Sequence, residues 1–248
     1  MVFKNASTVS TIKGANPSAL RDAVQKLAVE ADPGASGEGG FGEASGSGSA
    51  WMGAPPPKNY ENITEEVDVL NLDLLNASSD FGGARTLFDG SSPSSLDQKG
   101  TEGKKDWVES DTDEQLMLFV PFRATLKVHT LQITSLPPTE GDDEVPMRPK
   151  TLKIYSNRPN NLGFEEADDM AETQLIELSE DDWDNKTGTA NVELRFVKFQ
   201  NATSLVVFVV DGDGDGEKVR IDRVRVVGES GEKRDPGKLQ KVGDEAGE

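Results

Sequence analysis

The stretch from 192 to 228, VELRFVKFQNATSLVVFVVDGDGDGEKVRIDRVRVVG, is the feature that most constrains how this chain can fold. It contains three apolar runs separated by two turn sequences, and β-branched and aromatic residues at this density favour strands. The runs cover 192–199, 205–210 and 219–227, and the turns are Gln200-Asn201 and Asp211 to Gly216. The middle run, LVVFVV, is apolar at every position, which predicts a strand covered on both faces. The third run changes register near Asp222-Arg223, which predicts a bulge.

Similar short runs recur upstream and extend the β pattern. The additional predicted strands lie at 69–75, 116–120, 126–136, 151–156 and 174–178. Residues 81–105 should form a long loop, 157–173 a loop with at most one helical turn, and Ser179 should cap a turn of EDDW. About eight or nine short strands with almost no helix predict a mainly β fold, a jelly-roll β-sandwich, over residues 63–229.

The flanking segments have different compositions. Residues 1–32 predict two short strands and a helix that begins at Asn16-Pro17. Residues 33–62 are rich in Gly, Ser and Pro and predict a flexible, disordered linker. Within that linker, the pair Trp51-Met52 is interpreted as incidental rather than as a short docking motif. Residues 230–248 are polar and charged and predict a disordered tail.

Composition excludes several classes of function. The chain has 45 acidic and 26 basic residues and a net charge of -19, which disfavours nucleic acid and anionic membranes as partners. It has no Cys and one His, so thiol redox chemistry and a Cys- or His-built zinc site are excluded. No apolar run approaches the roughly 20 residues that span a bilayer, and no signal peptide is evident. We therefore expect a cytoplasmic and nuclear monomer that is not an enzyme and has no cofactor.

Four blocks of the chain resemble the PITH domain family, the proteasome-interacting domain that follows thioredoxin in thioredoxin-like proteins. The blocks are ESDTDEQLMLFVPF at 109–122, TLKIYSNRPNNLGFEEAD at 151–168, LRFVKFQNATSLVVFV at 194–209 and RIDRVRVVG at 220–228. The resemblance implies a jelly-roll β-sandwich related to galactose-binding domains. It also implies association with the regulatory particle of the proteasome.

The N-terminal residues resemble a different fold. FKN followed by GANPSALRDAVQKL is similar to the last hairpin and helix of a thioredoxin domain. The Cys-x-x-Cys motif of that family is missing from this sequence. The resemblance therefore implies a ββα thioredoxin fragment, with the redox activity lost.

One acidic loop has the spacing of a calcium-binding loop. Carboxylates occupy positions 1, 3, 5 and 12 and a glycine position 6, as in an EF-hand. These residues are Asp211, Asp213, Asp215, Asp222 and Gly216. The flanking strands, Lys218 at position 8 and the short twelfth side chain favour a simple hairpin turn instead. A calcium-assisted carbohydrate or small-ligand binding sandwich is kept as the alternative function.

Two polar clusters are candidates for partner binding. Asp111, Asp113, Glu114 and Gln115 precede one predicted strand, and Lys198, Gln200 and Asn201 end another. For both clusters a local structural role, such as capping backbone donors or forming a turn, is the preferred interpretation. His129 lies within a predicted strand and is also interpreted as structural, because no nucleophile is predicted beside it.

Overall fold

The computed structural model of the chain describes residues 2–4, 7–10, 50–96, 105–138 and 145–230. It divides into two units, Met1–Gly48 and Ser49–Glu248. In the first unit, β1 (Val2–Lys4) and β2 (Ser7–Ser10) form an antiparallel hairpin. The helix predicted to follow them lies outside the described residues, as do residues 33–49 of the predicted linker and residues 231–248 of the predicted tail 230–248.

The second unit is built from antiparallel strands with short helical turns between them. The strands are β3 (Glu61–Asn62), β4 (Asp73–Leu75), β5 (Val108–Glu109), β6 (Leu116–Thr134), β7 (Pro149–Ser156), β8 (Gln174–Glu177), β9 (Thr189–Glu193), β10 (Ala202–Gly212), β11 (Arg220–Ile221) and β12 (Arg223–Ser230). The helical turns are η1 (Thr64–Glu66), η2 (Ala84–Phe88), η3 (Ser94–Leu96), α2 (Phe164–Asp169), η4 (Glu180–Asp182) and η5 (Phe196–Lys198). None of the described helices is long and apolar enough to cross a membrane.

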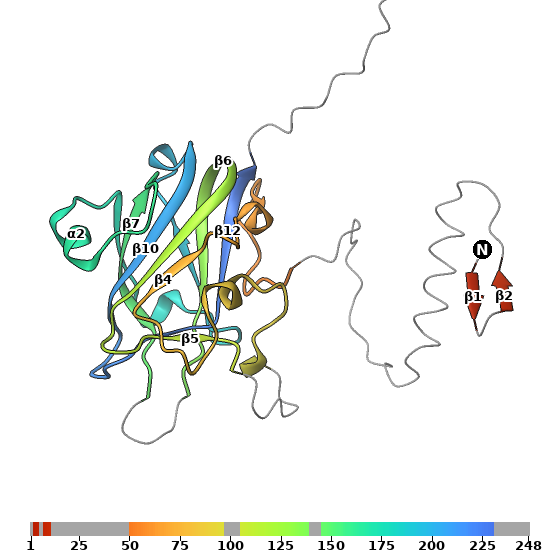
Figure 1. Cartoon of the computed structure of the whole chain (residues 1–248), viewed down its shortest axis with the longest axis horizontal. Coiled ribbons are helices and arrows are strands. Elements are labelled where there is room, and N and C mark those ends of the chain that lie inside the picture. Colours follow the sequence, from red (N-terminus) through yellow and green to blue (C-terminus); the bar gives the residue numbers. More distant parts are fainter. Residues whose placement is uncertain (1, 5–6, 11–49, 97–104, 139–144, 231–248) are drawn as a thin grey trace, which may run out of the picture. The chain divides into compact units, whose positions relative to one another are not determined.

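The long strand β6 joins the two layers of the sandwich (Figure 1). Its first half pairs with β10 and β4, and its second half pairs with β12 and β9. The main path of the sheet is β3-β12-β6-β10-β7-β8. Inward side chains of both layers belong to one buried core, for example Leu118 and Leu131 of β6 and Val226 of β12. This arrangement confirms the predicted mainly β sandwich.

Strand β10 is buried on both faces, as its uninterrupted apolar sequence predicts. Leu205, Val207 and Val209 face the main core, whereas Val206 and Phe208 face a second, smaller core. The segment around α2 covers this smaller core on the outside of the sheet. There the hydroxyl of Tyr155 donates a hydrogen bond of 2.6 Å to a carbonyl of that helix. Burial, together with nearby carboxylates, raises the pKa of Tyr155 to about 12.

Several predicted strand limits need correction. The predicted strand 192–199 ends at Glu193, and residues 196–198 form the turn η5. The N–H of Leu194 still bonds to β6, at His129, and the chain then turns: the N–H of Lys198 donates to the carbonyl of Arg195, and the N–H of Arg195 donates to the Gln174 side chain. The predicted strand 69–75 is reduced to Asp73–Leu75, and the predicted strands 116–120 and 126–136 are parts of the single strand β6.

The register change near Asp222 has a topological cause. Arg220 and Ile221 pair with β5, and from Arg223 onward the chain pairs with β6. Asp222 lies between the two pairings, and its backbone N–H donates a 2.7 Å bond to Thr134. The apolar side chains before Asp222, Val219 and Ile221, and those after it, Val224 and Val226, are all buried as a result.

The interpretation of residues 50–62 as part of a flexible linker was wrong. The N–H of Trp51 donates to the carbonyl of Gly90 at 2.8 Å, and the carbonyl of Ala54 accepts a 2.8 Å bond from Gln132. Gly53 lies so close to Thr189 that a Cβ there would fall 1.8 Å from its Oγ1. Hydrogen bonds to the sandwich hold these residues in place. The composition of a segment does not show which of its residues have such distant partners.

Candidate functional site: a buried arginine network and an exposed turn

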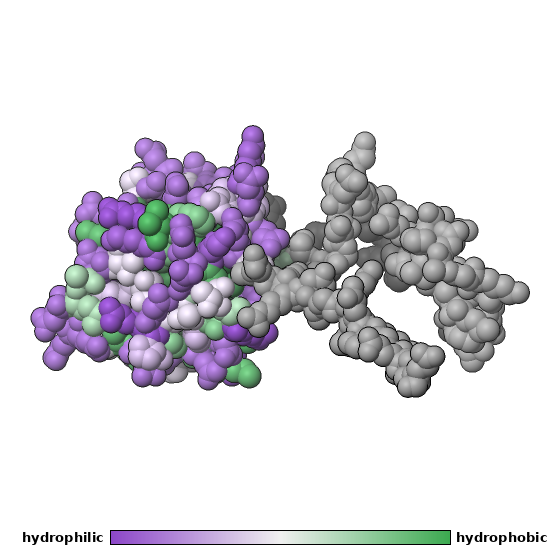
Figure 2. All heavy atoms as spheres, turned by 90° about the horizontal axis from the view of Figure 1, so that it is seen from above, coloured by the Kyte–Doolittle hydropathy of each residue, from purple (hydrophilic) through white to green (hydrophobic). Residues whose placement is uncertain are grey.

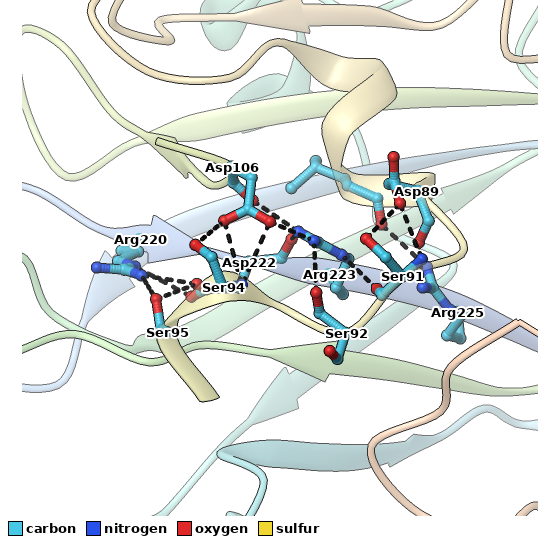
Figure 3. A network of polar contacts seen from close by, with 11 residues as sticks. Asp89, Ser91, Ser92, Ser94, Ser95, Asp106, Arg220, Asp222, Arg223 and Arg225 are labelled. Atoms are coloured by element: carbon cyan, nitrogen blue, oxygen red, sulfur yellow. Dashed lines mark hydrogen bonds and ion pairs between the residues drawn. The ribbon is translucent and has the colours of Figure 1, made fainter. Parts of the chain in front are cut away.

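Three arginines, Arg220, Arg223 and Arg225, form hydrogen bonds with residues of the segment that contains η2 and η3 (Figure 3). Arg223 is fully buried and forms an ion pair of 2.7 Å with Asp106. The same guanidinium donates to the carbonyls of Ser91 and Ser92, at 3.1 and 3.2 Å. Burial would raise the pKa of Asp106, but hydrogen bonds from Ser94 and the charge of Arg223 hold it below its ordinary value. The ion pair therefore attaches the loop to β12.

Arg225 has a different environment, because its guanidinium donates hydrogen bonds to several carbonyl oxygens. It donates to Trp51 at 2.7 Å and to Leu87 at 3.2 Å, and it also bonds to the carbonyl of Asp89. Burial lowers the pKa of Arg225, and the positive charge of Arg223 lowers it further, to about 10. Carbonyl dipoles thus take the place of water around this buried cation.

Arg220 completes the network. It forms a buried ion pair of 2.7 Å with Asp222, and the Ser95 hydroxyl accepts a 2.5 Å hydrogen bond from it. Its guanidinium lies 3.8 Å from the centre of the Trp107 ring. Because the polar groups of the network are engaged with one another, we assign it a structural role: it fixes residues 50–54 and 84–96 against β12. Sequence reasoning missed it, although the alternation Arg-Val-Arg-Val at 223–226 was a usable signal.

The carboxylates of the candidate calcium loop do not converge on one point. Asp222 is buried beside Arg220, whereas Asp211 accepts a 2.8 Å bond from the backbone of Thr151. Asp213 is 3.9 Å from Lys150. In the part of the chain that the structure describes, no group of three His, Cys, Asp or Glu residues is placed to hold a metal ion. A hollow of about 420 Å³ lies between this turn and Met147, with Arg148 in its wall.

The first candidate cluster for partner binding is organised by Asn76. The side chain of Asn76 donates to Asp113 Oδ1 and to the carbonyl of Gln115, both at 2.7 Å. Asp113 also accepts the backbone N–H of Gln115 at 3.1 Å, and Asp111 donates its N–H to the carbonyl of Asn76. This geometry agrees with the structural interpretation, and binding by Glu114 and its neighbours stays a prediction.

The second candidate cluster lies at the other end of β10. Gln200 and Asn201 are exposed in the turn before β10, and Lys198 Nζ donates a 2.8 Å bond to the carbonyl of Thr173. The register pairs Val209 with Leu116 and Ala202 with Leu126. At about 3.3 Å per residue the two clusters are therefore separated by roughly 20 Å, and they do not form one site.

The second cluster belongs to an exposed surface that sequence reasoning identified only in part. We call it the η5 surface, and it consists of Tyr60, His129, Arg195, Phe196, Val197 and Lys198. The rings of Tyr60 and His129 are stacked with centroids 3.9 Å apart, and Phe196 lies edge-on to Tyr60 at 5.8 Å. His129 Nδ1 lies 2.8 Å from the hydroxyl of Thr130. This environment agrees with a structural role for His129.

Val197 is the most exposed of the large apolar residues in the described part of the chain. Its exposed fraction is 83%, against 70% for Leu70 and 47% for Leu175. Figure 2 shows hydrophilic residues over most of one face of the sandwich, with apolar residues in small separate spots. A single exposed apolar residue is common on protein surfaces, but the aromatic and arginine side chains beside Val197 are of the types that are enriched at protein–protein interfaces.

Fold and surface together define a β-sandwich module with a buried structural network and an exposed apolar turn. A family profile described as the PITH domain matches residues 53–244. The chain belongs to the PITH domain family.

Two relatives support this membership. "Thioredoxin-like protein 1" of Schizosaccharomyces pombe is 35% identical over 240 residues, which cover 97% of this chain and 72% of that protein. Because the alignment covers nearly the whole chain, it includes most of the residues before the sandwich. A PITH domain-containing protein of Drosophila pseudoobscura is 28% identical over 174 residues, 69% of this chain and 71% of that protein.

Solved structures with a similar arrangement of strands are more distant. A family 32 carbohydrate-binding module of Clostridium perfringens NanJ, in complex with galactose, has a TM-score of 0.40 at 13% identity and covers 68% of this chain and 98% of that one. Two such domains of Clostridium perfringens ZmpB, in complex with GalNAc, have a TM-score of 0.46 at 9% identity, covering 70% and 37%. These two similarities concern the fold alone and do not indicate a ligand for this chain.

Proposed function

We propose that this chain is a non-catalytic module that binds the regulatory particle of the proteasome in the cytoplasm and nucleus. The observation that supports the proposal is family membership, because the matched residues 53–244 include nearly the whole sandwich. The fold is consistent with a binding role. Its buried charges are paired or hydrogen-bonded within the sandwich, and the apolar residue left most exposed lies on a turn at its surface.

A reductase function does not fit the residues of this chain. Reduction of a disulfide by a thioredoxin-type mechanism requires a thiolate that attacks sulfur, and the sequence contains no Cys. The similarity to thioredoxin-like relatives therefore concerns ancestry and architecture. In a disulfide-reduction assay the chain should show no turnover above background, and measurable turnover would overturn the proposal that it is non-catalytic.

The direct test is binding to purified regulatory particle. The immobilised chain should retain the particle in a saturable manner, with a dissociation constant at or below the micromolar range. Isolated 20S core particle is the matched control and should not be retained. A chain that is folded by circular dichroism and fails to bind regulatory particle at tens of micromolar would contradict the proposal.

A further inference from the structure

The η5 surface has an apolar residue that the fold does not use. Val197 points into solvent at 83% exposure, whereas Phe199 in the same segment is buried in the core. A β-branched apolar side chain in that position adds nothing to the core, and its apolar area is available for burial by another molecule. Burying it would favour association.

The turn that carries Val197 is held rigidly by the sandwich. The N–H of Leu194 donates to His129, and the N–H of Arg195 donates to the Gln174 side chain, each at 2.8 Å. The N–H of Lys198 closes the turn onto Arg195 at 2.7 Å, and its ammonium group reaches Thr173. A turn held in this way loses little conformational freedom when a partner binds it, which favours affinity.

The segment that carries the turn is basic, whereas the chain as a whole is acidic. Residues 194–210 contain Arg195 and Lys198 and no Asp or Glu, although the chain carries a net charge of -19. Among the described residues neither Arg195 nor Lys198 forms an ion pair. The acidic side chain closest in sequence, Glu193, faces His129 at 3.9 Å.

We propose that the η5 surface is the docking surface of this module, and that its partner presents an apolar pocket bordered by carboxylates. Val197 enters the pocket, Phe196 and Tyr60 pack around its rim, and the cations of Arg195 and Lys198 face the carboxylates. The inference rests on the proposed function, and the expected partner is an acidic protein surface of the regulatory particle. Complementary charges of this kind set the orientation and speed of association.

The first test measures affinity for purified regulatory particle with Val197→Asp and with Leu70→Asp, a matched control at another exposed apolar residue. Both side chains are exposed, so both variants should fold, which thermal unfolding checks. We expect Val197→Asp to weaken binding by about tenfold or more and Leu70→Asp to leave it within about twofold. Equal affinities of Val197→Asp and the unaltered chain would overturn the docking surface while the proposed function stands. Failure of the unaltered chain to bind would overturn both.

The second test concerns the chemistry of the partner. The double change Arg195→Glu with Lys198→Glu should slow association by about tenfold at low salt and remove most of its salt dependence. Lys150→Glu, at the opposite end of β10, is the control and should have little effect. A photo-crosslinking residue at position 197 should label a partner peptide rich in Asp and Glu. Labelling of a basic peptide, or an unchanged salt dependence in the double variant, would overturn the proposed charge complementarity.

Discussion

The guanidinium of Arg225 donates a 2.7 Å hydrogen bond to the carbonyl of Trp51, although 174 positions separate the two residues. It also lies 6.0 Å from the centre of the Trp51 ring. This pair joins the last strand of the sandwich to the segment that precedes its first strand. The ordered module therefore begins before residue 53, where the family profile starts to match.

Replacing Arg225 should destabilise the sandwich strongly. Arg225→Met keeps the volume of the stem but removes the donor that binds the carbonyls of Trp51 and Leu87. We expect a loss of about 2–4 kcal/mol in the free energy of unfolding, measured by urea denaturation. Arg225→Lys should recover little of this, since one ammonium group cannot reach all the carbonyls that the guanidinium binds. A variant as stable as the unaltered chain would contradict the role given to the network.

The ion pair between Asp106 and Arg223 predicts a specific loss of stability in acid. The pKa of Asp106 is lowered in the folded state, so its stabilising contribution is complete above the ordinary value of 3.8 and is lost as pH falls through the folded pKa. Asp106→Asn should be less stable by about 1–3 kcal/mol at pH 7. The difference between the two proteins should begin to shrink below about pH 4, where the unfolded chain takes up a proton at Asp106, and should be lost once pH has fallen through the lowered folded pKa. Unfolding curves from pH 7 to pH 2.5 measure this, and a constant difference would argue against the assignment.

Gly53 should not tolerate a side chain. An added Cβ would lie 1.8 Å from Oγ1 of Thr189, so Gly53→Ala must displace either β9 or the segment that carries Trp51. We expect a cost of about 1–3 kcal/mol, read as a lower midpoint of thermal unfolding. Gly163→Ala is the matched control, because no atom lies within 4 Å of its added Cβ. A similar midpoint for both variants would show that residues 50–54 do not pack as described.

The Asp-rich turn should not respond to calcium. Asp222, which the EF-hand spacing would place as the twelfth ligand, is held by Arg220 inside the sandwich. We therefore expect millimolar calcium to leave the melting temperature unchanged, with Asp213→Ala behaving like the unaltered chain. A rise in melting temperature that depends on calcium and disappears in Asp213→Ala would revive the alternative of calcium-assisted ligand binding.

The sequence predicted local features whose cause is local. The unbroken apolar run at 205–210 indicated a strand covered on both faces, and Ser179 does cap η4 through Asp182. The resemblance carried by the four blocks predicted the family and the sandwich. Such features depend on the side-chain pattern of a few residues and on hydrogen bonds between residues that are close in the sequence.

The errors came from contacts between distant segments. Val197 was predicted to lie in a strand because β-branched and aromatic residues surround it, but the chain turns after Leu194, where the Gln174 side chain binds the N–H of Arg195. Trp51 was interpreted as incidental because its neighbours are Gly, Ser and Pro, whereas Arg225 binds its carbonyl. Neither partner can be identified from sequence spacing.

By itself, the sequence determined that this chain forms a mainly β sandwich of the PITH family and that it lacks the thiols of a reductase. The tertiary structure alone decided that three arginines of one segment lie buried under a distant loop, and that Val197 remains in solvent on a rigid turn. The physical reason is that strand periodicity is encoded in neighbouring residues. The burial of a charge or the exposure of an apolar group depends instead on which remote backbone groups come close enough to bond.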